Sequence, residues 1–234
     1  IAFYGIETAW WHNMSEFIQI AVDNPKKAVR LHQFDIDNLE CLKWTNNNHS
    51  SYWDFLFSFI ASFYKIDVAD VRKGKYPQVI RSIIWGNTNS IERYDIQAKS
   101  NNVPLETYNK IKTASVIFDN PNHLVKIAKP KVLIVLNWNE GEDWFVKNQT
   151  DVHYYQINEH IFYYYLRSTN THIFQTHHPR SLNIRFGFDN IIEELLTLFK
   201  AYHIWETLPS GIDEIFVSEV IVDNTIRRHQ FIAD

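Results

Sequence analysis

Three polar residues in this sequence follow apolar runs and are suited to act together on a bound molecule. Glu7 follows the run at the start of the chain, Asn87 comes shortly after a run that ends at Trp85, and His178 follows the run 171–176. A carboxylate can activate a water or stabilise a developing positive charge. An amide can recognise a donor–acceptor pair on a planar heterocycle. An imidazole can donate a hydrogen bond to an oxygen that becomes anionic as a leaving group departs.

The apolar runs predict the strands that must position these residues. Residues 131–137, KVLIVLN, form a continuous aliphatic run, which is typical of a parallel strand covered on both faces. Residues 79–85 and 160–166 are further strand candidates. We expect a mainly parallel sheet of about four or five strands that includes residues 1–5, 80–85, 131–136 and 172–176.

Helical patterns alternate with these runs. Residues 51–65 predict a buried helix capped by Ser50 or Ser51, and residues 105–128 also have a helical pattern. Residues 188–203 predict an amphipathic helix with Asp189 as its N-cap. The alternation favours a three-layer α/β/α fold around a short, mostly parallel central sheet, with helices on both faces.

Polar groups that follow parallel strands gather at the carboxyl edge of the sheet. We therefore expect Glu7, Asn87 and His178 to line one cleft. Each residue also has an ordinary interpretation. Glu7 can be a surface residue at a helix N-terminus, Asn87 can belong to an Asx turn, and His178 can be bonded to a backbone carbonyl.

The order of these segments resembles that of the uracil-DNA glycosylase superfamily. Gly5-Ile6-Glu7 is similar to the family's Gly-x-acid/amide motif after the first strand, and Asn87-Thr88 is similar to its strand ending in Asn-Thr. Pro130-Lys131-Val132 resembles the family's Pro-Lys-Val strand. His178-Pro179-Arg180-Ser181-Leu182 resembles its His-Pro-Ser-Pro-Leu-type loop before a helix. The resemblance covers about residues 1–200, with Thr8 where the family usually has Pro and Arg180 where it has Ser.

The resemblance implies a uracil-DNA glycosylase-like domain over residues 1–203 that acts on DNA. Its activity would be hydrolysis of the N-glycosidic bond of uracil or a related damaged base, without a metal or other cofactor. The roles that it implies are catalytic for Glu7 and His178, and base-binding for Asn87, Trp10 and Phe17. DNA contacts are implied for Arg180, Arg185 and Leu182, with the leucine entering the space left by a flipped base. As ordinary alternatives, Leu182 and the aromatic residues belong to the core and the arginines are solvated.

Two other functions fit the same residues. The first is a non-catalytic binding or scaffolding protein on the same fold, which Thr8 and the net charge of −4 favour. The second is an unrelated α/β hydrolase with a carboxylate–histidine site. Convergence of Glu7, Asn87 and His178 on one pocket flanked by positive surface would favour the glycosylase.

Composition and charge limit the classes of function and the kinds of site that this chain can have. The net charge argues against binding of nucleic acid by bulk charge, but it leaves room for a local basic patch. Cys41 is the single cysteine, so an intrachain disulfide, a thiolate zinc site and a four-cysteine iron–sulfur cluster are excluded. A reducing, cytoplasmic location is expected, although a secreted protein with one buried thiol would have the same composition. The first residues predict no signal peptide, and no apolar run reaches the ~18 residues that span a bilayer. Residues 204–234 are expected to pack on the same domain as an extension.

Overall fold

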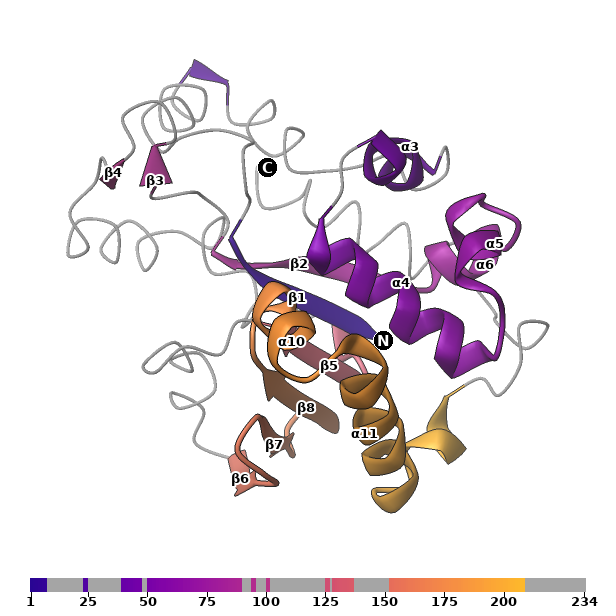
Figure 1. The fold of residues 1–234 in the computed structure, drawn as a ribbon. Helices are drawn as coiled ribbons and strands as arrows, with labels where there is room; N and C mark the ends of the chain where they lie inside the picture. Colours follow the sequence, from indigo (N-terminus) through magenta and orange to yellow (C-terminus); the bar gives the residue numbers. More distant parts are fainter. Residues whose placement is uncertain are drawn as a thin grey trace.

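The computed structural model describes nine stretches of the chain (Figure 1). They are residues 1–7, 23–24, 39–47, 50–89, 94–95, 100–101, 125–126, 128–136 and 152–208.

A six-stranded sheet with the order β2-β1-β5-β8-β7-β6 forms the centre of the fold. The first four of these strands are parallel to one another, whereas β7 and β6 are antiparallel to their neighbours. The strands are β1 (Ala2–Glu7), β2 (Ile84–Asn89), β5 (Val132–Leu136), β6 (Val152–Gln156), β7 (Ile161–Leu166) and β8 (Thr171–Thr176). The predicted α/β class is thus confirmed, with one or two more strands than expected. A separate pair is formed by β3 (Tyr94–Asp95) and β4 (Ser100–Asn101).

The strand predicted over residues 79–85 begins later in the structure. Residues 79–81 belong to a helix, α6 (Pro77–Arg81), and β2 begins only at Ile84. Pro77 occupies the first turn of α6, where its fixed φ favours a helix and its missing N–H costs nothing. Val79 and Ile80 are buried, but they belong to this helix and not to a strand. As a result Asn87 and Thr88 lie within β2, not after it.

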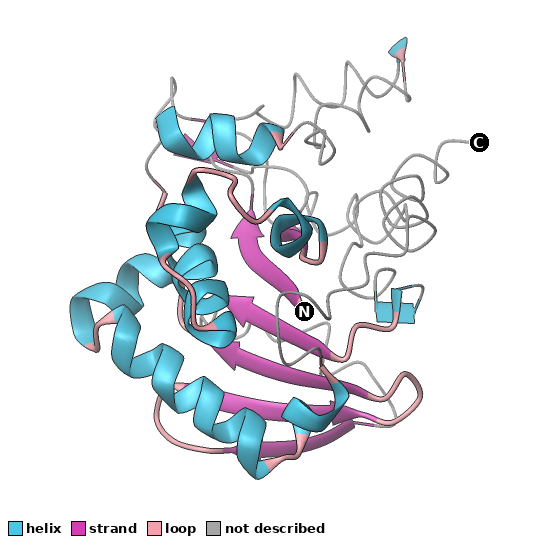
Figure 2. Ribbon diagram, turned by 90° about the vertical axis from the view of Figure 1, so that its right-hand side faces the viewer, coloured by secondary structure: helices cyan, strands magenta, loops and turns pink. Residues whose placement is uncertain are grey.

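Helices α4 (Ser51–Tyr64), α10 (Pro179–Arg185) and α11 (Phe188–Ala201) cover one face of the sheet (Figures 1 and 2). Phenylalanines from both layers form the centre of this core. The ring of Phe59 on α4 lies 5.5 Å from that of Phe3 on β1 and 5.6 Å from that of Phe199 on α11. Smaller helices complete the described set: α3 (Glu40–Asn47), α5 (Val68–Arg72) and the 3₁₀ helix η1 (Ile204–Thr207).

A second buried cluster occupies the opposite face of the sheet. Successive residues of β5 alternate between the two clusters, with Ile134 in the first and Leu133 and Val135 in the second. Val125 and Ala128 pack against this second cluster. Both are helical and lie in the range 105–128 that was predicted to be a helix, most of which is outside the described residues.

The ends of the long helices follow from local chemistry. Ser50 is the N-cap of α4, as predicted. The predicted N-cap of α11 was wrong, because the cap is Gly187 and Asp189 lies in the first turn. Gly187 has φ 77, a conformation that only glycine adopts readily, and this lets the chain reverse between α10 and α11. After α11, Trp205 stacks on Phe63 with ring centroids 4.5 Å apart, so the start of the predicted extension packs on the same core.

Candidate functional site

The carboxyl ends of the four parallel strands meet at one edge of the sheet. Tyr4 of β1 lies opposite Val135 of β5, which lies opposite Gln175 of β8. Glu7 and His178 each come three positions after this row. Glu7 ends β1 and His178 follows the end of β8 by two residues, so both belong to the carboxyl edge, with β5 between their strands. Two strand spacings correspond to about 10 Å.

Asn87 lies lower in the sheet than expected. It pairs with Gly5 inside β2, whereas Asn89 pairs with Glu7 at the end of the strand. The side chains of Glu7 and Asn87 are outside the described residues, as are Trp10 and Phe17 altogether. Convergence of these groups on one cleft therefore stays a prediction. Asn89 was missed because the helix at Pro77 moves the start of β2 towards the carboxyl side.

His178 is the predicted site residue whose side chain the structure describes in most detail. It follows β8 and is the N-cap of α10, where its Nδ1 accepts a hydrogen bond of 3.3 Å from the backbone N–H of Arg180. An Nδ1 that accepts carries no proton, so the ring proton is on Nε2. Burial, and secondly the charge of Arg180, lower the pKa of His178. At neutral pH the residue is therefore an uncharged imidazole with Nε2–H as its donor.

Helix α10 buries one of the predicted DNA contacts and exposes the others. Leu182 has no exposed surface and belongs to the main core, which agrees with its alternative interpretation as a core residue. In this position it cannot reach DNA. Arg180 and Arg185 are exposed. The apolar residue on the exposed side of α10 is instead Ile184, which is 78% exposed.

Ile184 could have been found from the helical pattern. Leu182 and Phe186 are four positions apart and face the core, so the residue midway between them must lie on the other side of the helix. Ile184 is also four positions after Arg180, which makes the two side chains neighbours on the surface of α10. The motif around Leu182 drew attention to that residue instead.

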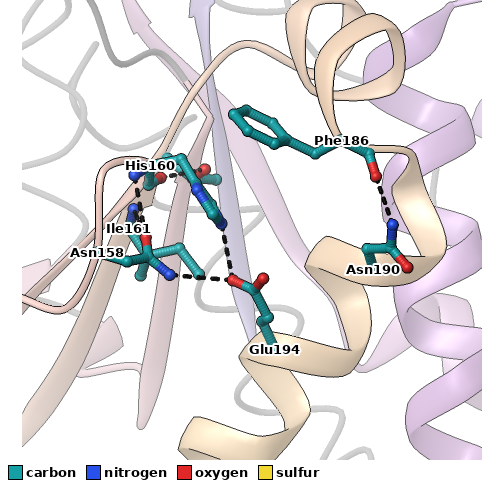
Figure 3. A network of polar contacts seen from close by, with 7 residues as sticks. Asn158, His160, Ile161, Phe186, Asn190 and Glu194 are labelled. Carbon is teal, nitrogen blue, oxygen red and sulfur yellow. Dashed lines mark hydrogen bonds and ion pairs between the residues drawn. The ribbon is translucent and has the colours of Figure 1, made fainter.

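A polar network joins the turn between β6 and β7 to α11 at the same edge of the sheet (Figure 3). Nε2 of His160 donates to Oε2 of Glu194 over 2.7 Å, and Nδ2 of Asn158 donates to the same oxygen over 3.1 Å. Oδ1 of Asn158 accepts from the backbone N–H groups of His160 and Ile161. The hydroxyl of Thr176, the last residue of β8, donates to the carbonyl of His160.

Aromatic contacts extend this network towards His178. The ring of His160 stacks on Phe186 with centroids 4.4 Å apart, and His177 stacks on Phe186 with centroids 6.4 Å apart. Sequence analysis missed these residues because His160 was assigned to a strand. The polar run Asn158-Glu159-His160, directly before an apolar strand, was the available signal for a turn.

A second aromatic cluster lies further from the carboxyl edge. Tyr163 stacks on Tyr202 at 4.1 Å, and a hydrogen bond of 2.9 Å joins its hydroxyl to Nδ1 of His172. Burial raises the pKa of Tyr163 far above its usual value, and neighbouring tyrosines add to the effect. The phenol therefore stays protonated at neutral pH, and its contacts indicate a structural role.

Searches for two other kinds of feature were negative within the described ranges. No group of three or more His, Cys, Asp or Glu side chains there is arranged to hold a metal ion. Of the helices in those ranges, none has the length and apolar character needed to cross a membrane.

No match was found for this chain among protein-family models, curated proteins or solved structures.

Proposed function

We propose that the chain is a DNA glycosylase-like protein that hydrolyses the N-glycosidic bond of uracil or a related damaged base. The observation that carries this proposal is the state of His178. Its Nδ1 is occupied as a helix cap, its pKa is lowered by burial, and its Nε2–H remains as a neutral donor at the carboxyl edge of the sheet. A neutral donor suits an oxygen that gains negative charge during the reaction.

The reaction that we propose breaks the bond between the sugar and the base. The bonding electron pair leaves with the base, one of whose oxygens becomes anionic, and the sugar becomes an oxocarbenium ion. His178 donates to that oxygen. Glu7, at the carboxyl end of β1, stabilises the cation and orients a water, which adds to the sugar carbon and loses a proton to the carboxylate. One such donor lowers the activation free energy by on the order of 3 kcal/mol.

Base recognition is assigned to Asn87, with Trp10 or Phe17 stacking on the base. An amide can donate to and accept from the polar edge of uracil at once. Asn89 is a second candidate for this role, since its backbone is in register with that of Glu7.

The exposed surface of α10 is assigned to the DNA backbone. Arg180 and Arg185 would contact phosphates, and Ile184 would enter the space left by the flipped base, the role that the resemblance gave to Leu182. The exposure of Ile184 beside two arginines supports this assignment.

A three-layer, uracil-DNA glycosylase-like fold is part of the proposal. Its support is the buried cluster on the second face of the sheet, against which the helical residues Val125 and Ala128 pack. A second helical layer over residues 105–128 would account for the complete burial of Leu133 and Val135 on that face.

The proposal is tested with oligonucleotides that contain uracil, hypoxanthine or xanthine, as single and double strands, followed by alkaline cleavage at abasic sites. We expect base release that is lost in His178→Ala and strongly reduced in Glu7→Gln, the first by about a hundredfold or more. Asn87→Asp should impair recognition of uracil, because it replaces an amide donor with an acceptor. His203→Ala, at an exposed histidine after α11, is the control.

A wild-type protein that leaves all three bases untouched in both strand forms would overturn the enzymatic proposal. The non-catalytic binding or scaffolding protein on the same fold would then be the better interpretation, which the net charge of −4 also favours. Under the enzymatic proposal, binding to DNA should weaken with salt where phosphates are contacted, with a shallow slope because the net charge is −4.

A further inference from the structure

We propose that Glu194 is a positioning residue for His178, and that it acts through His160 and Phe186. The importance of His178 rests on the proposed function, but the positioning itself is a property of the fold.

The orientation of the His160 ring depends on Glu194. The side chain of His160 is 9% exposed, and within the described residues its Nδ1 has no hydrogen-bond partner. The bond from Nε2 to the Glu194 carboxylate is therefore the polar contact that fixes the ring (Figure 3). Asn158 donates to the same carboxylate oxygen, which holds Glu194 in place from the other side. Removal of the carboxylate would leave a buried imidazole with both nitrogens unpaired, which is costly.

Helix α11 holds a second point of the same arrangement. Nδ2 of Asn190, one turn before Glu194, donates to the backbone carbonyl of Phe186 over 2.7 Å. Phe186 is the C-cap of α10, and its N–H bonds to the carbonyl of Leu182. One face of α11 therefore holds both the turn that carries His160 and the end of α10. The ring of His160 also packs on that of Phe186, so the turn and the end of α10 contact each other as well as α11.

Phe186 transmits this arrangement to His178. Its ring also stacks on His177, the residue before His178. Helix α10 has only seven residues, so a tilt that moves Phe186 also moves the N-cap. Pro179 and Leu182 anchor the inner side of the helix in the core. The contact of His160 with Phe186 then sets how α10 is rotated about these two buried residues. The rotation of α10 in turn sets the direction of the His178 imidazole.

The test compares Glu194→Ala and Glu194→Gln with Glu193→Ala. Glu193 is the residue before Glu194 on α11 and is exposed, so its substitution is the matched control for charge and position. The first readout is the ¹⁵N chemical shift and pH titration of the His178 imidazole, measured by NMR on the free protein. In Glu194→Ala we expect the pKa of His178 to rise towards its ordinary value and the preference for Nε2–H to weaken, because the cap and the burial both loosen. Glu194→Gln, which keeps an acceptor for His160, should restore most of the wild-type signal.

A second variant covers the case in which Glu194→Ala fails to fold. Phe186→Leu keeps an apolar side chain but removes the stacked ring, so it should produce the same change at His178 while the bond between His160 and Glu194 stays intact. If these variants lower the melting temperature but leave the shifts and titration of His178 unchanged, Glu194 has only a structural role and the proposal is overturned.

Activity provides a separate readout. On uracil-containing DNA, Glu194→Ala should lower kcat by about tenfold to a hundredfold with little change in KM, since misplacement of a catalytic group has effects of this size. If the wild type releases no base but the His178 spectra respond as expected, the proposed function fails and the positioning role stands. If the enzyme is active and the kcat of Glu194→Ala equals that of Glu193→Ala, the positioning role fails alone.

Discussion

Leu182 and Ile184 are two positions apart on α10 but have opposite surroundings. The first is fully buried in the core and the second is 78% exposed. Leu182→Ala should therefore lower the free energy of unfolding by about 2–5 kcal/mol, because it leaves a cavity. Ile184→Ala should change it by less than about 0.5 kcal/mol. Urea unfolding followed by tryptophan fluorescence measures both, and equal losses in the two variants would contradict the orientation of α10.

The same pair separates a structural role from a DNA-binding role. Under the proposed function, Ile184→Ala weakens binding to uracil-containing duplex although its stability is unchanged. Fluorescence anisotropy with a labelled duplex measures this, and Asn183→Ala, at the exposed position before it, is the control. Binding equal to that of the wild type would remove Ile184 from the interface.

Two histidines link stability to pH. Burial and Lys131 lower the pKa of His172, and burial and Arg180 lower that of His178, in each case below the ordinary 6.5. Between 6.5 and the lowered values the unfolded chain binds protons that the native protein does not. The free energy of unfolding should therefore fall as the pH decreases through this window. Urea unfolding between about pH 7.5 and 5.5 should show a shallower slope in His172→Gln/His178→Gln, and an unchanged slope would refute the assignment.

Among the elements, α4 ends at an unfavourable residue. Its C-cap Lys65 has φ 54, in the left-handed region, and its N–H bonds to the carbonyls of Ala61 and Ser62. Glycine adopts this conformation without strain. Lys65→Gly should therefore raise the free energy of unfolding by about 0.5–1 kcal/mol, after allowance for the greater freedom of glycine in the unfolded chain. Thermal unfolding should show a rise of a few degrees, about 2–4 °C per kcal/mol. Lys65→Ala, which keeps the strain, should show no such rise.

The elements also show how far the sequence could predict the fold. The continuous apolar run of β5 predicted a strand correctly, because it is short, rich in β-branched residues and directly preceded by Lys131 and Pro130. The apolar run before β2 was wrongly predicted to be a strand, because buried apolar residues such as Val79 and Ile80 suit a helix as well as a strand. Pro77 favours the helix. The cap of α11 depended on the positive φ of Gly187, which is a property of the turn and not of the hydrophobic pattern.

The candidate site was predictable only in part. His178 was found because a histidine after a buried strand is a local signal. The network of His160 and Glu194 was not, since its partners come from a turn and a helix that tertiary packing alone brings together. The assignment of Leu182 to DNA depended on a motif. Helical periodicity, which pairs Leu182 with the partly buried Phe186, would have favoured Ile184.

At the scale of the whole molecule, the sheet should not be equally stable throughout. Every residue of β5 is fully buried, and β5 lies between two paired strands, β1 and β8. The amides of β5 should exchange with solvent only on global unfolding, whereas those of β6, at the end of the strand order, should exchange by local opening. Hydrogen exchange read by mass spectrometry tests this. Peptides covering 132–136 that exchange as fast as those covering 152–156 would contradict it.

The position of β1 between two other strands has a consequence during synthesis. This strand pairs with β2 on one side and β5 on the other (Figure 1), and Phe3 is in register with Ile134 of β5. At translation rates of about 5–20 residues per second, β1 waits on the order of ten seconds before its second partner leaves the ribosome. Over that interval at least one backbone edge of an apolar strand is unpaired, which is the state that chaperones bind and that aggregates form from. Because β1 is made long before β5, it is among the strands of this sheet that depend longest on protection by chaperones.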